Sequence, residues 1–257
     1  MLRKLIKYDT MWMNKVMPIY FFILLCFALL TKIASNFTDS FMGQVIFNIC
    51  NSCMIGAICS CFINCFMRIW IRFRNNFYGD ESYLTHTLPV SKTTLYNSKI
   101  ISAIISLLIT LVFFAIGFFI AYLDEPLLEK IRLIFESKEQ LFLFIVLVFI
   151  GILEMIFMIF SGILGIVIGQ RFNHGKTIKS VLIAIGIYWF IQGIVFGILL
   201  ISSLLSSDIG NLFINRSIEN LDALKSFIYI TLITYLLFDL GLYWCGKKFF
   251  KIGVNVD

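Results

Sequence analysis

Six long apolar stretches dominate this sequence and leave few folds open to it. They lie near residues 18–35, 42–66, 100–123, 141–169, 181–205 and 226–245. A helix needs about 20 mostly apolar residues to cross the hydrocarbon core of a bilayer. The mean hydropathy is +0.94 and only 14% of the residues are charged, which is too little charge to cover a soluble domain of this size. We therefore expect an all-α, polytopic membrane protein, with a single membrane domain over residues 1–257 and six transmembrane helices.

The charges between these stretches predict the orientation of the chain. If the N-terminus lies inside, 15 of the 21 Lys and Arg residues and only 4 of the 15 acidic residues fall in inside segments. Lys and Arg accumulate on the cytoplasmic side of membrane proteins. We therefore expect the N- and C-termini to be cytoplasmic. The net charge of +6 then reports topology, and we expect no nucleic-acid partner.

Residues 1–17 have the pattern of an amphipathic helix that lies at a membrane surface. At about 100° per residue, the basic and apolar side chains separate onto opposite sides. The basic side holds Arg3, Lys4, Lys7 and Lys15, and the apolar side holds Leu2, Leu5, Ile6, Trp12, Met13 and Val16. Such an interfacial helix turns its basic residues towards lipid headgroups. Asp9 lies in the middle of the apolar side, so we expect it to face the protein or an attached subunit rather than lipid.

Two of the apolar stretches carry polar side chains that lipid does not tolerate. In the second stretch, Gln44, Asn48, Asn51 and Ser52 fall within about 100° of one another on a helix. Gln192 is the comparable feature of the fifth stretch. Such side chains face other helices or a water-accessible cavity. Hydrogen bonding between helices and lining of a translocation path are equally consistent with these positions.

Two carboxylates, Glu154 and Asp239, lie inside apolar stretches. Charged groups within a bilayer are costly, so each of them is a functional candidate. Glu154 shares a helix face with small or flexible residues that suit close packing, namely Gly151, Met158, Ser161, Gly162 and Gly165. Glu154 is either a buried carboxyl group hydrogen-bonded to a neighbouring helix or a residue of the transport path or of proton coupling. Asp239 lies nearer the inner surface, and we interpret it as structural.

No pattern in the sequence predicts a catalytic or metal site. The two histidines, His86 and His174, lie in polar loops without a second ligand at helical spacing. Five of the seven cysteines fall in the second apolar stretch, and no His or carboxylate accompanies them there, so we expect them to pack between helices. Gly175-Lys176-Thr177 resembles the end of a phosphate-binding loop, but Gln170 stands where that loop requires glycine. We therefore expect this chain neither to bind ATP by itself nor to act as an enzyme.

The longest polar interval between two apolar stretches covers residues 77–99. Asp80-Glu81 opens a short amphipathic helical turn in this interval, and Leu88-Pro89 ends it. Proline disfavours helical geometry in the residue that precedes it, and Ser91 is of the type that caps helix N-termini. We expect a new helix to begin at Ser91 and to continue into the third apolar stretch.

The amino-acid sequence of this interval resembles the cytoplasmic loop of ABC-2-type transporter permeases. The shared motifs are Gly79-Asp80-Glu81, Tyr83-Leu84-Thr85, Thr87-Leu88-Pro89-Val90-Ser91 and Ser98-Lys99. The layout is similar as well, with a basic amphipathic N-terminal helix, six spans and a fourth span rich in small residues. The similarity of amino-acid sequence is confined to this interval, and over the full length only the order of the predicted helices is similar.

The resemblance implies the transmembrane subunit of a bacterial ABC exporter in the cytoplasmic membrane. Such a subunit dimerises with an identical or a different permease and binds two copies of a separate ATPase. ATP and Mg²⁺ would bind that ATPase, and this chain would hold no cofactor. The loop would form a coupling helix that docks on the ATPase through Asp80, Glu81, Tyr83, Leu84, Thr85, His86, Thr87, Leu88 and Pro89.

The cargo implied by this interpretation is hydrophobic or amphipathic, such as an antimicrobial peptide, a drug or a lipid-like molecule. The absence of a strongly charged path through the apolar stretches favours such a cargo. The residues expected along the translocation path are Gln44, Asn48, Asn51, Glu154 and Gln192. The alternative function is an ion- or proton-coupled secondary transporter that uses Glu154.

Overall fold

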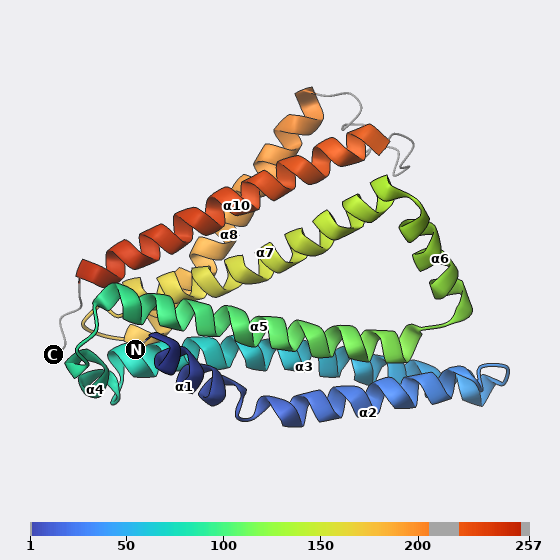
Figure 1. The fold of residues 1–257 in the computed structure, drawn as a ribbon, viewed down its shortest axis with the longest axis horizontal. Coiled ribbons are helices and arrows are strands. Elements are labelled where there is room, and N and C mark those ends of the chain that lie inside the picture. Colours follow the sequence, from blue (N-terminus) through green and yellow to red (C-terminus); the bar gives the residue numbers. More distant parts are fainter. Residues whose placement is uncertain (1, 206–220, 253–257) are drawn as a thin grey trace. The chain divides into compact units, whose positions relative to one another are not determined.

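The computed structural model describes residues 2–205 and 221–252, in which all regular structure is helical (Figure 1). In chain order the helices are α1 (Leu2–Asn14), α2 (Met17–Ser35), α3 (Phe41–Tyr78), α4 (Ser82–Thr87), α5 (Lys92–Tyr122), α6 (Glu125–Glu136), α7 (Lys138–Gly169), α8 (Lys176–Leu205) and α10 (Leu221–Ile252). Contacts divide the chain after Arg132 into two compact units, which are described separately. A single membrane domain over residues 1–257 stays a prediction.

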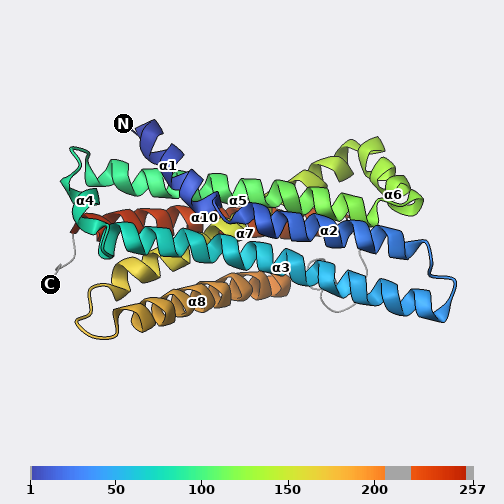
Figure 2. The ribbon, with the colours of Figure 1, turned by 90° about the horizontal axis from the view of Figure 1, so that it is seen from below.

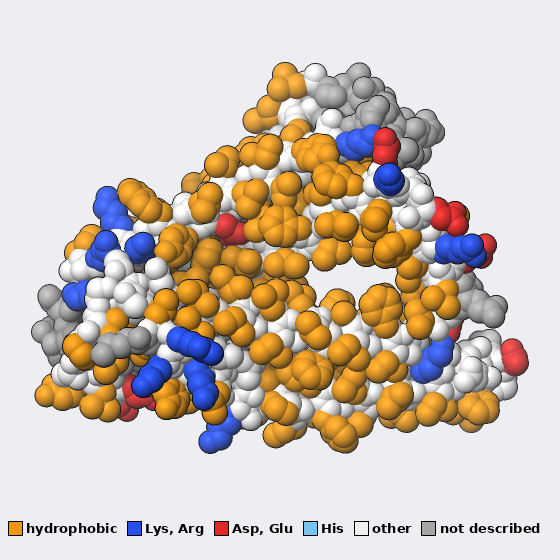
Figure 3. Space-filling model, in the orientation of Figure 1, with side chains coloured by type: hydrophobic (Ala, Val, Ile, Leu, Met, Phe, Trp, Pro, Cys, Tyr) orange, Lys and Arg blue, Asp and Glu red, His pale blue; other side chains and the backbone are white. Residues whose placement is uncertain are grey.

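Six of these helices, α2, α3, α5, α7, α8 and α10, are long and apolar enough to cross a membrane. They coincide with the six apolar stretches of the sequence. Hydrophobic side chains cover much of the visible surface along them (Figure 3). The prediction of an all-α protein with six helices of membrane-spanning length is therefore confirmed.

In the first unit, α2, α3 and α5 pack against one another, and α1 packs mainly against α5 (Figure 2). The side chains of Leu24, Met54 and Leu107 are fully buried between these helices. The rings of Phe21 and Phe113 stack with their centroids 4.1 Å apart, which joins α2 to α5. Van der Waals packing of this kind holds apolar helices together where lipid removes the hydrophobic driving force.

Helix α3 extends beyond the span predicted from hydropathy. It begins at Phe41, where the Ser40 Oγ accepts a hydrogen bond from the backbone N–H of Gly43 at 3.0 Å. It ends at Tyr78 instead of near residue 66. Its 38 residues make it about 57 Å long, nearly twice the thickness of a hydrocarbon core, at about 1.5 Å per residue. The last turns of α3 therefore carry polar residues as part of a helix rather than of a loop.

The break between α4 and α5 lies where the sequence predicts it. Leu88 leaves the helical region with φ −64° and ψ 135°, as expected for a residue that precedes proline. The Ser91 Oγ then accepts a hydrogen bond from the backbone N–H of Thr94 at 3.3 Å and caps α5. Helix α5 runs without interruption from Lys92 into the third apolar stretch.

In the second unit, α7 packs against both α8 and α10. Glycines allow the closest approach, because a Cβ atom built on Gly165 would lie 2.5 Å from the Cβ of Ala184. A Cβ atom on Gly169 would lie 2.4 Å from the Cα of Ser180. At Gly151, one end of the predicted small-residue stripe, no atom of another described helix lies within 4 Å of such a Cβ. The stripe therefore brings α7 and α8 together only towards its C-terminal end.

Candidate functional site

The side chains of α4 are largely exposed although several of them are apolar. Tyr83 is 77% exposed, Leu84 is 69% exposed and Leu88, just after the helix, is 41% exposed. Among the other residues predicted to dock an ATPase, Thr85 is half-buried, and Asp80, Glu81, His86, Thr87 and Pro89 are exposed. The predicted docking residues therefore lie together on one short helix and its flanks, with their apolar members uncovered.

One residue of this segment, Glu81, is anchored to the end of α3. Its Oε2 accepts a hydrogen bond from Arg72 Nη1 at 2.9 Å and another from Asn76 Nδ2. Glu81 occupies the N-cap position of α4 but makes no capping hydrogen bond, because its carboxylate is used by α3. A helix of six residues is too short to be stable alone. The bonds of Glu81 therefore contribute to holding α4 in place.

The hydrogen bonds continue from Asn76 to α5 and α1. The Lys99 Nζ donates to Asn76 Oδ1 and, at 2.6 Å, to Asp9 Oδ1. Arg72 Nε donates to the same Asp9 oxygen at 3.0 Å. These bonds close a ring through Asp9, Arg72, Asn76, Glu81 and Lys99, which we call the ion cluster. It joins α1, α3, α5 and the residue that precedes α4.

The ion cluster is balanced in charge, and three of its five members are deeply buried, whereas Arg72 is half-buried and Glu81 is exposed. Asp9, Asn76 and Lys99 are 2%, 4% and 3% exposed, respectively. A buried charge is costly unless it is paired and hydrogen-bonded, and here two carboxylates face one ammonium and one guanidinium group. The ring of Phe77 lies 5.8 Å from the Lys99 Nζ and covers it with an aromatic face. Such an arrangement fixes the relative positions of the helices that it joins.

Two arginines of α3, Arg72 of the ion cluster and Arg68 outside it, attach α1 to α3. Arg68 Nε donates to the backbone oxygen of Met13 at 2.6 Å, and Arg68 Nη2 donates to that of Trp12 at 2.9 Å. These carbonyl groups belong to the last turn of α1, where helix carbonyls lack regular backbone partners. The Trp12 oxygen also accepts a hydrogen bond from the backbone N–H of Lys15 at 3.3 Å. The guanidinium groups of Arg68 and Arg72 each lie 5.0 Å from the centre of the Trp12 ring. The C-terminal end of α1 is thereby capped by side chains of α3.

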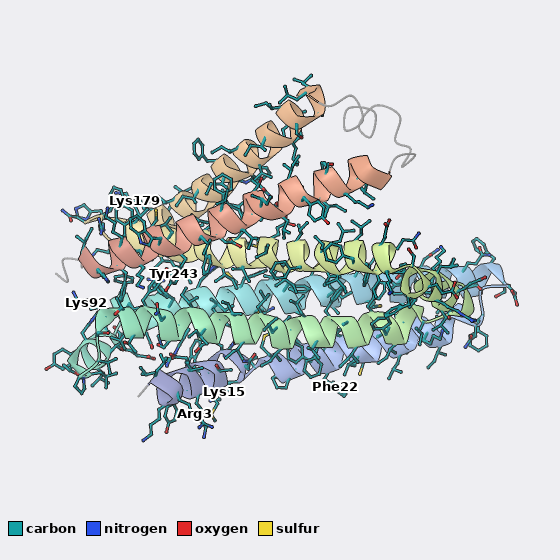
Figure 4. The ribbon with its side chains drawn as sticks, turned by 45° about the horizontal axis from the view of Figure 1, so that its top comes forward. Arg3, Lys15, Phe22, Lys92, Lys179 and Tyr243 are labelled. Atoms are coloured by element: carbon teal, nitrogen blue, oxygen red, sulfur yellow. The ribbon has the colours of Figure 1, made fainter. Side chains whose placement is uncertain are left out.

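The structure resolves the position of Asp9 and leaves the basic side of α1 uncovered. Asp9 faces the protein, which is one of the two alternatives that the sequence allowed. Arg3 and Lys15 project away from the helices, as Figure 4 shows, and Lys4 and Lys7 are exposed too. Lys and Arg side chains gather over α1 on the face seen in Figure 3. A role of α1 at a lipid surface stays a prediction.

The predicted path residues of the first unit do not come together as a group. Gln44 and Asn48 are exposed on α3. The Asn51 Oδ1 instead accepts a hydrogen bond from the Tyr122 hydroxyl of α5. For Asn51, the structure thus favours hydrogen bonding between helices.

The predicted path residues of the second unit do meet. Gln192 Nε2 donates to Glu154 Oε1 at 3.4 Å, and the Tyr235 hydroxyl donates to Gln192 Oε1 at 3.2 Å. These three residues, which we call the Glu154 site, come from α7, α8 and α10. The sequence allowed Glu154 to be a buried carboxyl group hydrogen-bonded to a neighbouring helix. The hydrogen bond is present, but the Glu154 side chain is exposed rather than buried. Asp239 is 5% exposed, and neither of its carboxylate oxygens has a hydrogen-bond partner among the described residues.

Sequence reasoning named Asp9, Glu81 and Lys99 but neither their contacts nor the α3 members of the ion cluster. Arg68, Arg72 and Asn76 recur at every fourth position and so share one face of α3, which is the signal that was available. Hydropathy alone placed the end of the span near residue 66, and residues 67–76 were not predicted to be helical. Among the described residues, no three His, Cys, Asp or Glu side chains gather as a metal site requires, and all seven cysteines are free.

Comparisons with known protein families, with curated proteins and with solved structures found no match for this chain.

Proposed function

We propose that the chain is the membrane-spanning permease subunit of an ABC-2-type exporter, driven by a separate ATPase. The cargo is hydrophobic or amphipathic, and both termini lie on the cytoplasmic side of a bacterial membrane. The observation that carries the proposal is the exposed apolar surface of α4. This helix lies in the segment whose amino-acid sequence resembles the ATPase-docking loop of such permeases. Tyr83 and Leu84 are the most exposed members of that surface.

The chemistry of α4 supports docking to a protein rather than contact with water. Aromatic side chains are enriched at protein interfaces, and large apolar side chains gain most when a partner covers them. Tyr83, Leu84 and Leu88 together provide such an anchor, and Asp80 and His86 lie at its polar edge. The permease dimer would present two copies of this surface to two ATPase subunits, which bind ATP and Mg²⁺.

The ion cluster supports a mechanical role for this surface. A displacement of α4 acts on Glu81, whose carboxylate is bonded to Arg72 and Asn76 at the end of α3. Asn76 is bonded to Lys99 in α5, and Lys99 to Asp9 in α1. When ATP closes the ATPase pair, the ends of α3 and α5 would move with α4, and α1 would follow. Coupling of this kind requires that the ATPase bind two permease conformations with different free energies.

The test is to purify the tagged chain from its native membrane in mild detergent and to identify what accompanies it. The proposal predicts a stoichiometric P-loop ATPase, together with a second permease if the complex is a heterodimer. Recovery of the chain alone, repeated after cross-linking with ATP present, would contradict it.

A second candidate function is an ion- or proton-coupled secondary transporter. It is favoured by one observation, the exposed carboxylate of Glu154 halfway along the membrane-length helix α7. This function predicts transport by the purified chain in liposomes under an ion gradient alone. Strict dependence of transport on an ATPase would exclude it.

A further inference from the structure

The Glu154 site holds a carboxylate whose charge no described residue compensates. Glu154 lies in the middle of a 32-residue helix of high hydropathy. Its hydrogen bond to the neutral amide of Gln192 is 3.4 Å long, at the weak end of the range for such bonds. No ion pair of the described residues involves Glu154, whereas the ion cluster compensates each of its carboxylates. A carboxylate at this depth requires a cation or a proton.

Aromatic rings on the same three helices form a cluster that includes Tyr235, a member of the Glu154 site. The ring of Phe157 lies 5.5 Å from that of Tyr188 and 6.1 Å from that of Tyr235, measured between centroids. The 69% exposed Trp189 stands at right angles to Tyr188 at 6.2 Å. Phe157 and Tyr235 are buried, at 0% and 6% exposed, whereas Tyr188 is half-buried. A ligand could therefore meet the exposed carboxylate of Glu154 and the rings of Tyr188 and Trp189.

This combination matches the chemistry of a hydrophobic cation. A carboxylate attracts the positive charge, and aromatic faces bind cations through their quadrupoles, while the apolar surroundings favour the rest of an amphipathic molecule. Gln192 is held between Glu154 and Tyr235, and so the acceptor oxygen of Glu154 is oriented before a ligand arrives. A ligand of negative charge would meet the carboxylate unfavourably.

We propose that Glu154 and Gln192, with the neighbouring rings of Tyr188 and Trp189 on α8, form a recognition site for the cationic nitrogen or phosphonium-like centre of an amphipathic ligand. The inference rests on the proposed export function, because it names the charge class of the cargo. The uncompensated carboxylate thus selects positively charged cargo from among hydrophobic molecules. Glu154 is the charge-recognising residue, and Gln192 positions it.

The experiment measures binding of two probes of the same shape and opposite charge to the full-length chain in nanodiscs. Tetraphenylphosphonium and tetraphenylborate serve as the cation and the anion, with empty nanodiscs to subtract partition into lipid. The wild-type chain is expected to bind the cation in preference to the anion. Glu154→Gln is expected to weaken cation binding by about tenfold or more, which corresponds to about 1.4 kcal/mol. Glu154→Asp should retain part of the affinity.

Glu139→Gln is the matched control, because it is the same substitution on the same helix and Glu139 is an exposed carboxylate paired with Lys225. It should leave cation binding unchanged. Tyr188→Leu should weaken cation binding by a few-fold through loss of an aromatic face. If Glu154→Gln does not assemble, the graded losses in Glu154→Asp and Tyr188→Leu carry the test instead.

Equal binding of both probes by the wild-type chain, or cation binding that is independent of Glu154, would overturn the inference. Cation binding independent of Glu154 together with Glu154-dependent transport under a proton gradient would assign the carboxylate to a proton instead. Co-purification of the ATPase is measured on the same samples. A chain that binds the cation but no ATPase refutes the export proposal alone, and a chain that binds the ATPase without charge selection refutes this inference alone.

Discussion

The Nζ of Lys99 in α5 lies 2.6 Å from the Oδ1 of Asp9 in α1, across 90 positions of sequence. Both side chains are almost completely buried. The pair connects the first helix of the chain to the helix that follows the α4 segment. Through Asn76, Arg72 and Glu81 it also connects both to the surface that we propose to dock the ATPase.

Removal of the Lys99 charge should destabilise the first unit strongly. Lys99→Met keeps the aliphatic stem but leaves Asp9 buried with Arg72 as its one cation. Loss of one partner of a buried ion pair typically costs about 3–5 kcal/mol. We expect a lower melting temperature for the chain in detergent, measured by differential scanning fluorimetry.

Lys92→Met is the matched control for this substitution, because Lys92 lies at the exposed start of the same helix. It should leave the melting temperature nearly unchanged. The double variant Asp9→Asn with Lys99→Met should be more stable than the sum of the single losses predicts. Strict additivity of the two losses would show that the pair is not coupled.

A charge placed on the apolar face of α4 should prevent ATPase association. Leu84→Asp puts a carboxylate where we expect the partner to bury an apolar side chain, and burial of an unpaired charge is costly. The ATPase recovered with the tagged permease should fall by about tenfold, while the amount of permease in the membrane stays the same. Leu84 is 69% exposed, so folding should tolerate the change.

Phe172→Asp provides the comparison for Leu84→Asp. Phe172 is 42% exposed in the turn between α7 and α8, on the side that the charge distribution predicts to be cytoplasmic. This variant should recover the ATPase as the wild type does. If Leu84→Asp also binds the ATPase normally, α4 is not the docking surface.

The close approach of α7 and α8 predicts opposite effects for two glycine substitutions on one helix. Gly165→Ala places a Cβ 2.5 Å from Ala184 and 2.7 Å from its backbone, so the helices must separate. Overpacking of this kind costs about 1–3 kcal/mol. Gly151→Ala meets nothing within 4 Å and should be neutral or stabilising, because alanine favours helices. Equal melting temperatures for the two variants would contradict the packing at Gly165.

The hydrogen bond between Asn51 and Tyr122 predicts which polar residues of α3 are structural. Tyr122→Phe and Asn51→Leu should each lower stability by about 1 kcal/mol, because each removes a hydrogen bond between α3 and α5. Asn48→Leu should leave stability unchanged, since the Asn48 side chain is exposed. Thermal unfolding of the three variants distinguishes these cases, and a larger loss in Asn48→Leu than in Asn51→Leu would reverse the assignment.

Local patterns in the sequence were sufficient to predict the helices. The six apolar stretches and the break at Leu88-Pro89 depend on residues close together in the chain, where hydropathy and capping act directly. The extension of α3 to Tyr78 was not predicted, because Arg68 and Arg72 look like loop residues unless their partners are known. Those partners, Trp12 and Asp9, lie more than 50 positions away.

The sequence indicated several individual residues of the candidate sites, but it did not indicate which residues they contact. Asp9 was recognisable as an anomaly on an apolar helix face, yet nothing local indicated Lys99 as its partner. Glu154 and Gln192 were each expected on a path, and their meeting across 38 positions depends on how α7 and α8 pack. Asp239 was interpreted as structural, but no residue in the described part of the chain forms a hydrogen bond with its carboxylate to support that role.

The most direct test of the account is photo-cross-linking from α4 in the native membrane. Benzoylphenylalanine would replace Tyr83 in one sample and Phe172 in another, and the cross-linked product would be identified by mass spectrometry. The account predicts that the cross-linker at position 83 captures a P-loop ATPase and that the cross-linker at position 172 does not. A position 83 that captures only lipid or no protein, in membranes where the permease is assembled, would contradict the proposed docking surface.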